Sequence, residues 1–383
     1  MIRRIISDHV VRMAAQYAVV SVMGPRQSGK TTLVKNLFPN YRYVNLEDPD
    51  LRYFAQNDGA GFLRDNPAPL IIDEVQRVPE LLSRIQVSVD DNPRLKGRYI
   101  LTGSHQPALH AAVSQSLAGR VALINLLPFS LAELRSADIT LSREELIYNG
   151  FMPRIYDENA EASQLYSNYL QTYVERDVNV LVNLKDKRVF ESFLRLTAGR
   201  IGQLVNYESL ACELGVSAVT VKSWYSVLEA SYITFTLPPY FRNFGKRFVK
   251  TPKVYFTDVG LACHLLGIGE PSQIGRDPLF GGLFENMVIA DLIKARFNQG
   301  LQSDAYFLRD AKGREVDLVI ENSRRLDMYE IKSAMSCHED FTRNLDYFST
   351  VIPDVGKRRV VYSGGRTTLH DVQFVNFADS PFA

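Results

Sequence analysis

The sequence has little cysteine, no excess of charge of either sign and no long apolar run. Its 383 residues include only three cysteines, Cys212, Cys263 and Cys337, which lack the spacing of a disulfide framework or a zinc site. We therefore expect reduced, buried thiols. The 44 basic and 43 acidic side chains leave a formal charge of +1, so overall charge predicts no particular partner.

Signals that direct a chain to or through a membrane are also missing. The basic and apolar start is interrupted by Asp8 and Arg12 and lacks a small-residue cleavage site, so it predicts a helix that leads into a strand. The longest stretch without charge, residues 99–119, contains too many polar groups to cross a bilayer. We expect a soluble, cytoplasmic protein with no membrane contact.

The pattern of apolar residues divides the chain into three parts. The first 125 or so residues alternate short β-branched runs with helical stretches, which is typical of a parallel α/β sheet covered on both faces. Residues 128–267 are mainly helical and rich in aromatic side chains. After a glycine-rich linker at 267–282, a long helix and four strand-like runs predict a second α/β domain.

The strongest motif is Gly24-Pro25-Arg26-Gln27-Ser28-Gly29-Lys30-Thr31, a complete G-x-x-x-x-G-K-T between an apolar strand and a helical run. Its glycines let backbone N–H groups turn toward phosphate oxygens, and the helix dipole adds positive potential. We expect Lys30 to reach the β and γ phosphates of ATP and the Thr31 hydroxyl to bind Mg²⁺. A glycine turn that caps a helix is the alternative. Further predicted nucleotide contacts are Gly24, Arg26, Gln27, Ser28, Gly29 and Thr32.

Residues 69–74 form an apolar strand that ends in two acids, Asp73 and Glu74. Burial of this strand places both carboxylates at its carboxyl edge, beside the phosphate loop. We expect Asp73 to hold Mg²⁺, directly or through water, and Glu74 to polarise the attacking water. Because acids also favour the first turn of a helix, a simple helix start is the alternative.

Three later residues are candidates for sensing or stabilising the γ phosphate. Thr102 and Ser104 end the next strand, although turns commonly contain the same residues. Arg120 lies where a helix gives way to another strand. An arginine finger that completes a neighbouring subunit's site accelerates transfer by roughly 10³ to 10⁵, whereas a surface arginine is the plain alternative.

Several motifs along nearly the whole chain belong together: GPRQSGKTTL, LIIDEVQRVPEL, YILTGSHQ, SLAGRV, GFMPRIYDE, FENMVIADL and GREVDLVIE. They resemble a family of uncharacterised prokaryotic AAA+ ATPases, whose C-terminal region is similar to restriction endonucleases. The resemblance favours Arg120 as the finger and directs attention to Arg154 as a second sensor arginine. It also implies four domains: a P-loop AAA+ core at residues 1–127, a helical lid at 128–178, a winged-helix module at 179–267 and a restriction-endonuclease-like α/β domain at 268–383.

Residues 210–228 predict a helix, a turn at Gly215 and a second helix capped by Ser217, the pattern of a helix-turn-helix. Because Lys222 is the one cation on the outer face of that second helix, the helix alone should bind DNA weakly. The following segment adds cations and aromatic rings suited to a nucleic-acid backbone and bases, although a hydrophobic hairpin with a cationic solvent face is the alternative. These residues are Arg242, Lys246, Arg247, Lys250 and Lys253 with Phe241, Phe244 and Phe248.

Two apolar strands near the carboxyl end carry Asp317 and Glu330 at positions where burial is expected. Glu330 and Lys332 are two residues apart and so face the same side of their strand. Two carboxylates about 4 Å apart repel by roughly 4 kcal/mol at an effective dielectric constant near 20, and a divalent cation would turn that repulsion into binding. Asp317, Glu330 and Lys332, together with Glu285 on the preceding helix, match the D…E-x-K arrangement of restriction-endonuclease-like folds. In that arrangement Lys332 would stabilise charge on a phosphate. An exposed ion pair is the alternative.

We therefore predict an ATPase that uses Mg²⁺, forms a homo-oligomer and acts on DNA. A second divalent metal at Asp317 and Glu330 would make the C-terminal domain a nuclease, a point that the sequence leaves open. The alternative is an ATP-controlled switch that binds protein partners and has an inert C-terminal domain. DNA should stimulate ATP turnover in the first case and have no effect in the second.

Overall fold

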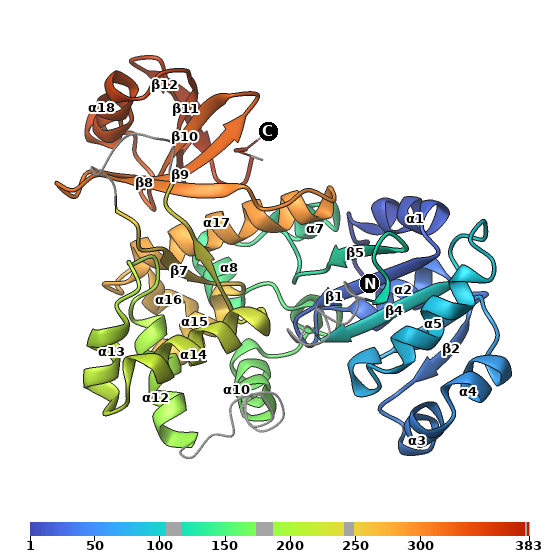
Figure 1. Ribbon diagram of the computed structural model, residues 1–383. Coiled ribbons are helices and arrows are strands. Elements are labelled where there is room, and N and C mark those ends of the chain that lie inside the picture. Colours follow the sequence, from blue (N-terminus) through green and yellow to red (C-terminus); the bar gives the residue numbers. More distant parts are fainter. Residues whose placement is uncertain (105–115, 174–186, 241–248, 380, 383) are drawn as a thin grey trace.

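The computed structural model describes residues 1–104, 116–173, 187–240, 249–379 and 381–382. Its N-terminal part is built on a five-stranded parallel sheet (Figure 1). The strand order β2-β3-β4-β1-β5 places β4 between β1 and β3. The strands are β1 (Val19–Gly24), β2 (Arg42–Asn45), β3 (Leu70–Asp73), β4 (Tyr99–Ser104) and β5 (Val121–Asn125).

Helices cover both faces of this sheet, because successive side chains of each buried strand point to opposite sides. In β1, Val20 and Val22 pack with one set of helices, whereas Val19 and Met23 pack with the other. The predicted parallel α/β fold is confirmed. One face carries α1 (Ser7–Gln16) and α2 (Lys30–Leu37); the other carries α3 (Pro49–Asn57), α4 (Gly59–Asp65), η1 (Val75–Arg77) and α5 (Leu81–Asp90).

The middle of the chain is helical, with one short antiparallel pair of strands. Capping boxes begin α7, at Ser130 and Glu133, and α8, at Ser142 and Glu145, which satisfies amides that the first helical turn leaves unpaired. The helices are α7 (Leu131–Ser136), α8 (Arg143–Asn149), α9 (Pro153–Asp157), α10 (Ala162–Tyr173), α12 (Lys187–Ala198), α13 (Tyr207–Leu214), α14 (Ala218–Ala230), α15 (Val259–Leu266) and α16 (Pro271–Ile274); the strands are β6 (Thr234–Leu237) and β7 (Lys253–Phe256).

The C-terminal part is a separate six-stranded mixed sheet of order β12-β13-β11-β10-β9-β8. Helix α18 (Arg343–Val351) packs on one face, and α17 (Phe280–Asn298) lies along the other, between this sheet and the helical middle (Figure 1). The strands are β8 (Ala305–Arg309), β9 (Glu315–Asn322), β10 (Arg325–Ile331), β11 (Val355–Tyr362), β12 (Thr367–Leu369) and β13 (Val372–Asn376).

One hydrophobic core joins the helical middle to α17 and to the inner face of the C-terminal sheet. It includes Ile268 and Ile274, which lie in the glycine-rich segment predicted as a linker. Because these side chains are buried, that segment is packed into the core. In this core the ring of Trp224 lies 5.3 Å from that of Phe190 and 5.2 Å from that of Phe193, measured between ring centres.

The prediction of buried cysteines is wrong for two of the three. Cys263 is buried, but Cys337 is only half-buried and Cys212 is exposed, because Cys212 lies on the solvent face of α13 while Leu210 and Ala211 face the core. Within the described ranges, no helix has both the length and the apolar character needed to span a membrane.

Candidate nucleotide site

The loop between β1 and α2 depends on a glycine and a buried lysine. Gly29 has a φ of +88°, in the left-handed region that favours glycine, and is the N-cap of α2. Lys30 is buried, and its Nζ donates to the carbonyl oxygens of Gly24 at 3.1 Å and of Pro25 at 2.7 Å. The loop therefore holds an ammonium group at its base.

Unpaired buried atoms of the same loop test whether it fits a phosphate. Among the described residues, Ser28 Oγ and Gln27 Oε1 are buried and have no hydrogen-bond partner. A buried polar group without a partner costs roughly 1–3 kcal/mol, so such groups are rare. Ser28 Oγ is a donor, but Ser28 is not among the residues that line the cleft above this loop, and Gln27 Oε1 is an acceptor that an anion does not satisfy. The feature that fits the loop to an anionic ligand is therefore the positive charge of Lys30.

Asp73 is the centre of the polar contacts at the carboxyl ends of the strands. Its Oδ2 accepts from the hydroxyls of Thr31 and Tyr43, each at 2.8 Å. Its Oδ1 accepts from the hydroxyl of Thr102 and, at 3.1 Å, from the N–H of Glu74. Asp73 is 4% exposed. The Asp73 carboxylate and the Thr31 hydroxyl are therefore adjacent oxygen donors, the type of ligand that Mg²⁺ prefers.

Tyr43 is a site residue that the sequence reasoning missed. Burial, followed by the hydrogen bond to Asp73, raises the pKa of Tyr43 well above its usual value, so the phenol remains a donor. The available signal was the position of residues 42–45, a short strand whose carboxyl end lies beside that of β3. Thr102, a candidate γ-phosphate sensor, donates its own hydroxyl to Asp73.

Glu74 follows Asp73 in an unusual backbone conformation. Its φ is +57°, which costs a residue other than glycine on the order of 1–3 kcal/mol and is often found at functional sites. The carboxylate accepts a hydrogen bond from the side-chain amide of Gln76. Glu74 lines the same cleft as Lys30 and Thr31, so its carboxylate is available to that space.

The cleft over the loop has a volume of about 960 Å³, within the roughly 300–1,000 Å³ of small-molecule sites. Its walls come from the loop and α2, from α9 and α10, and from the segment before α1, which no sequence motif had marked. The predicted contacts that line it are Arg26, Gln27, Gly29, Lys30, Thr31, Thr32 and Glu74, and the N-terminal segment adds Met1, Ile2, Arg3 and Arg4.

Of the other predicted residues, Arg154 lies at the cleft, whereas Arg120 precedes β5 beside the first residue of β1, at the opposite, amino edge of the sheet. Arg154 lines the cleft, and its Nε lies 2.8 Å from Oε2 of Glu158. Arg120 makes a two-point ion pair with Asp90, with Nε 2.5 Å from Oδ1 and Nη2 2.9 Å from Oδ2. This contact lowers the pKa of the Asp90 carboxyl. Ser104 pairs with Gly24 in the sheet, but its side chain lies outside the described part of the chain.

The C-terminal acids form a buried cluster with Lys332. The Nζ of Lys332 lies 2.6 Å from Glu330 Oε1 and 3.6 Å from Asp317 Oδ2, and Asp317 accepts from the N–H of Ile331 at 2.8 Å. Burial, and then the charge of Asp317, raises the pKa of Glu330 to about 8. The other carboxylate oxygen of Glu330 is buried and has no partner among the described residues.

The prediction that Lys253 belongs to a nucleic-acid-binding surface is wrong. Every residue of β7 is buried, and Lys253 is 2% exposed with its Nζ 2.9 Å from Glu285 Oε1 and 2.7 Å from Glu315 Oε1. Glu285 also accepts from the phenol of Tyr255. Lys253 faces inward because the acids of α17 and β9 compensate its charge there.

Lys250 is exposed, and the predicted residues Phe241, Arg242, Phe244, Lys246, Arg247 and Phe248 lie outside the described ranges.

Two lysines therefore compensate the acids of this cluster, which contains Glu285, Glu315, Asp317 and Glu330. Across the residues with described coordinates, no three His, Cys, Asp or Glu side chains are arranged to hold a metal ion. Asp317, Glu330 and Lys332 are brought together, and Glu285 joins them through Lys253.

The middle of the chain contains two helices joined by a tight turn, α13 and α14. Gly215 has a φ of +66°, and Ser217 accepts from the N–H of Thr220 at 3.1 Å as the cap of α14. Val221, Trp224 and Leu228 are buried, while Ser217, Lys222, Ser223 and Ser226 are exposed. The outer face of α14 thus carries small polar side chains and one cation, together with the exposed apolar side chain of Val219.

Three family models match the chain. An AAA domain matches residues 16–135, and two domains of unknown function, DUF8612 and DUF4143, match residues 141–272 and 280–378. The C-terminal match has no assigned function.

Two bacterial relatives align with most of the chain. The uncharacterized proteins Mb2031c of Mycobacterium bovis and Rv2008c of Mycobacterium tuberculosis are each 30% identical over 340 residues, which covers 86% of this chain and 74% of each relative.

Solved structures also align with part of the chain. The Walker-type ATPase PABY2304 of Pyrococcus abyssi is 16% identical with a TM-score of 0.43, covering 68% of this chain and 94% of that one. A RuvB point variant of Thermotoga maritima is 19% identical with a TM-score of 0.32, covering 61% of this chain and 87% of that one.

Proposed function

The chain belongs to an AAA-type ATPase family that includes Mb2031c and Rv2008c, and on that premise we propose that it binds and hydrolyses Mg-ATP at the loop of residues 24–31. The observation that carries the proposal is the 2.8 Å contact between Thr31 Oγ1 and Asp73 Oδ2, beside the buried ammonium of Lys30. A lysine, a hydroxyl and a carboxylate at one sheet edge are the groups that phosphoryl transfer from a nucleotide requires.

Each residue has a distinct task in this proposal. Thr31 and Asp73 would hold Mg²⁺, which when bound neutralises charge on the triphosphate. Lys30 exchanges its bonds to the Gly24 and Pro25 carbonyls for bonds to phosphate oxygens. Glu74 accepts a hydrogen bond from the attacking water and orients it. Gly24, Arg26, Gln27, Ser28, Gly29 and Thr32 shape the phosphate site, with Ser104 at the end of β4.

Arg120 acts in this proposal on a neighbouring subunit. It is held by Asp90 and is not among the residues that line the described cleft of its own subunit, so its contribution requires a homo-oligomer. An arginine supplied from a neighbour stabilises the charge of the transition state. Arg154, which lines the cleft, serves as the second sensor arginine.

DNA is the partner that we propose for the helical middle. The support is the pair α13 and α14, two helices joined by the turn at Gly215; the strands β6 and β7 follow them, but β7 is buried and offers no contact surface. The low positive charge of α14 agrees with weak binding through few phosphate contacts, so the affinity of this helix for DNA should fall only gradually with salt. ATP turnover would then drive movement of the winged-helix module and a nuclease-like C-terminal domain.

One observation favours the second candidate, a nucleotide-controlled switch with an inert C-terminal domain. Lys253 and Lys332 already compensate the acids at which a second metal would bind, so the repulsion that would favour a divalent cation is reduced. In this case protein partners, and not DNA, respond to ATP.

One set of assays tests both candidates. ATP hydrolysis is measured with and without single-stranded and duplex DNA, and the mass of the particle is measured in ATP. Stimulation by DNA supports the first candidate, and its absence, with a stable partner complex in Glu74→Gln, supports the second. Lys30→Ala should lose nucleotide binding and keep its fold; normal hydrolysis by this variant would refute the site.

A further inference from the structure

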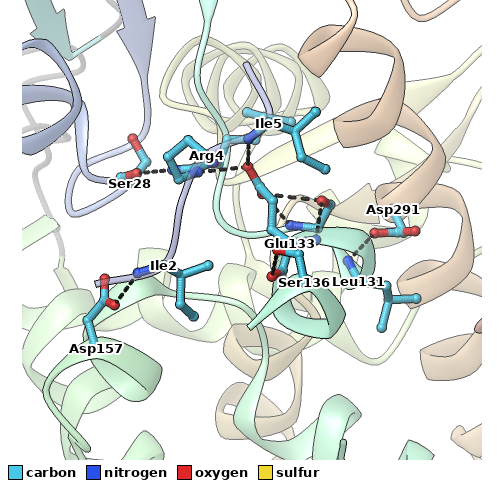
Figure 2. Close-up of polar contacts among 11 residues, drawn as sticks. Ile2, Arg4, Ile5, Ser28, Leu131, Glu133, Ser136, Asp157 and Asp291 are labelled. Atoms are coloured by element: carbon cyan, nitrogen blue, oxygen red, sulfur yellow. Dashed lines mark hydrogen bonds and ion pairs between the residues drawn. The ribbon is translucent and has the colours of Figure 1, made fainter. Parts of the chain in front are cut away.

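Arg4, in the segment before α1, contacts the phosphate loop at Ser28 (Figure 2). Its guanidinium makes three hydrogen bonds: Nη1 donates to the carbonyl of Ser28 at 2.8 Å, Nη2 to the carbonyl of Leu127 at 2.7 Å, and Nε to Glu133 Oε1 at 3.0 Å. It also lies over the ring of Phe129, 4.9 Å from the ring centre. Arg4 is 7% exposed, so one orientation of this side chain is strongly fixed.

Glu133 holds Arg4 in that orientation. Its carboxylate is fully buried; Oε1 also accepts from the N–H of Ile5 at 2.9 Å, and Oε2 accepts from the N–H of Ser130 at 2.8 Å. Hydrogen bonds between charged groups are stronger and more directional than neutral ones. The carboxylate therefore ties the N-terminal segment to the first turn of α7.

Helix α7 is fixed from its other side by the C-terminal part of the chain. The N–H of Leu131 donates to Asp291 Oδ1 at 2.7 Å, and Asp291 belongs to α17 (Figure 2). Two carboxylates, one from α7 itself and one from α17, thus bind amides at the start of the same helix. The support on which Glu133 depends is consequently rigid.

The contact between Arg4 and Ser28 determines the direction of a neighbouring N–H. The peptide between Ser28 and Gly29 is planar and trans, so its C=O and N–H point in opposite directions. Because Arg4 holds the Ser28 carbonyl oxygen, the Gly29 N–H is directed to the other side of the peptide. Bonds from such loop amides are what hold the phosphates of a nucleotide.

We propose that Arg4 is a positioning residue for the β phosphate: it fixes the direction of the Gly29 N–H, and Glu133 fixes Arg4. This inference rests on the nucleotide binding proposed above and adds a role that the loop motif does not contain. The role proposed for Arg4 differs from a general structural role, because Arg4 would affect binding of the β phosphate and not of the base, the ribose or the α phosphate. ADP and AMP, which differ by that phosphate, are therefore the diagnostic ligands.

The test is calorimetric titration of Mg-ADP and of AMP into the full chain, wild type and Arg4→Met. We expect ADP to bind about tenfold more weakly to Arg4→Met, equivalent to roughly 1.4 kcal/mol, with AMP affinity unchanged. Arg12→Met is the matched control, because Arg12 is exposed on α1 and should leave both affinities as in wild type.

Arg4→Lys separates positioning from a simple charge effect. Lysine keeps the charge but cannot bond in the plane to Ser28, Leu127 and Glu133 together, so ADP affinity should still fall. Wild-type ADP affinity in both Arg4 variants, or equal losses for ADP and AMP, would overturn the inference. If Arg4→Met does not unfold cooperatively, Arg4→Lys and Glu133→Gln provide the same comparison. If wild type binds neither nucleotide, the proposed function itself fails and this inference with it.

Discussion

The ammonium of Lys253 lies 2.9 Å from a carboxylate oxygen of Glu285, although the two residues come from different parts of the chain. Lys253 belongs to β7 in the predicted winged-helix module, and Glu285 belongs to α17 beneath the C-terminal sheet. The same ammonium contacts Glu315 at the start of β9. The acid cluster is thus completed by a cation from outside its own sheet, which joins the two parts electrostatically.

Replacing Lys253 by methionine should destabilise the folded chain. The variant keeps most of the side-chain volume but leaves Glu285 without its cation and Glu315 with Arg309 alone, and breaking a buried ion pair in this way costs about 3–5 kcal/mol. Urea unfolding followed by circular dichroism measures the loss. Lys250→Met, at an exposed position nearby, is the control and should change the free energy of unfolding little. Equal stability of the two variants would show that the ion pair contributes nothing.

The pKa of Glu330 predicts how stability depends on pH. Burial raises it to about 8, whereas the same carboxyl in the unfolded chain titrates near its ordinary value of 4.5. Between these pH values the folded state binds more protons than the unfolded state, so the free energy of unfolding should fall as pH rises from about 4.5 to 8. We expect Glu330 to contribute a loss on the order of 3 kcal/mol between pH 5.5 and 8.5.

Glu330→Gln should remove most of that dependence, since the amide does not titrate. Glu285, whose pKa burial raises to about 7, would account for the remainder. Glu191→Gln, at an exposed position on α12, serves as the control and should keep the wild-type slope. Urea titrations at a series of pH values give these slopes, and an unchanged slope in Glu330→Gln would contradict the assignment.

Local motifs and long-range contacts differ in how far the sequence reveals them. The parallel sheet was predictable because each buried strand has its own apolar run and each helix its own period. Asp73 could be proposed because its place at the end of a strand is a local property. Tyr43, Arg4 and Lys253 could not be assigned correctly, because their partners lie 30, 129 and 32 residues away, and only the folded backbone brings them together.

Lys253 shows how composition can mislead. In the sequence it follows other cations and aromatic residues, which favoured an exposed surface. Strand alternation alone does not decide which residues of a short strand are exposed, and all four residues of β7 are buried. A buried lysine is stable only where carboxylates compensate its charge. For Lys253 these carboxylates belong to Glu285 of α17 and Glu315 of β9.

Tyr43→Phe should raise the Mg²⁺ concentration that ATP hydrolysis requires. The substitution removes the 2.8 Å hydrogen bond that orients Asp73 but keeps the ring. Loss of such an outer contact typically costs about 10–100-fold in metal affinity, so the Mg²⁺ concentration for half-maximal activity should rise by about tenfold. Tyr53→Phe, at an exposed ring, is the matched control. An unchanged Mg²⁺ requirement would mean that Thr31 and Thr102 orient Asp73 without Tyr43.

Mixing two inactive variants should reveal whether Arg120 acts on a neighbouring subunit. Glu74→Gln removes the group that orients water, and Arg120→Ala removes the finger, worth roughly 10³ to 10⁵ in rate. If the finger works in trans, a mixed oligomer contains some sites with an intact Glu74 facing an intact Arg120. Hydrolysis should therefore return on mixing. Particle mass, measured in parallel, verifies that mixed oligomers form; full activity of Arg120→Ala alone, or no recovery in mixed particles, would refute a finger supplied by a neighbour.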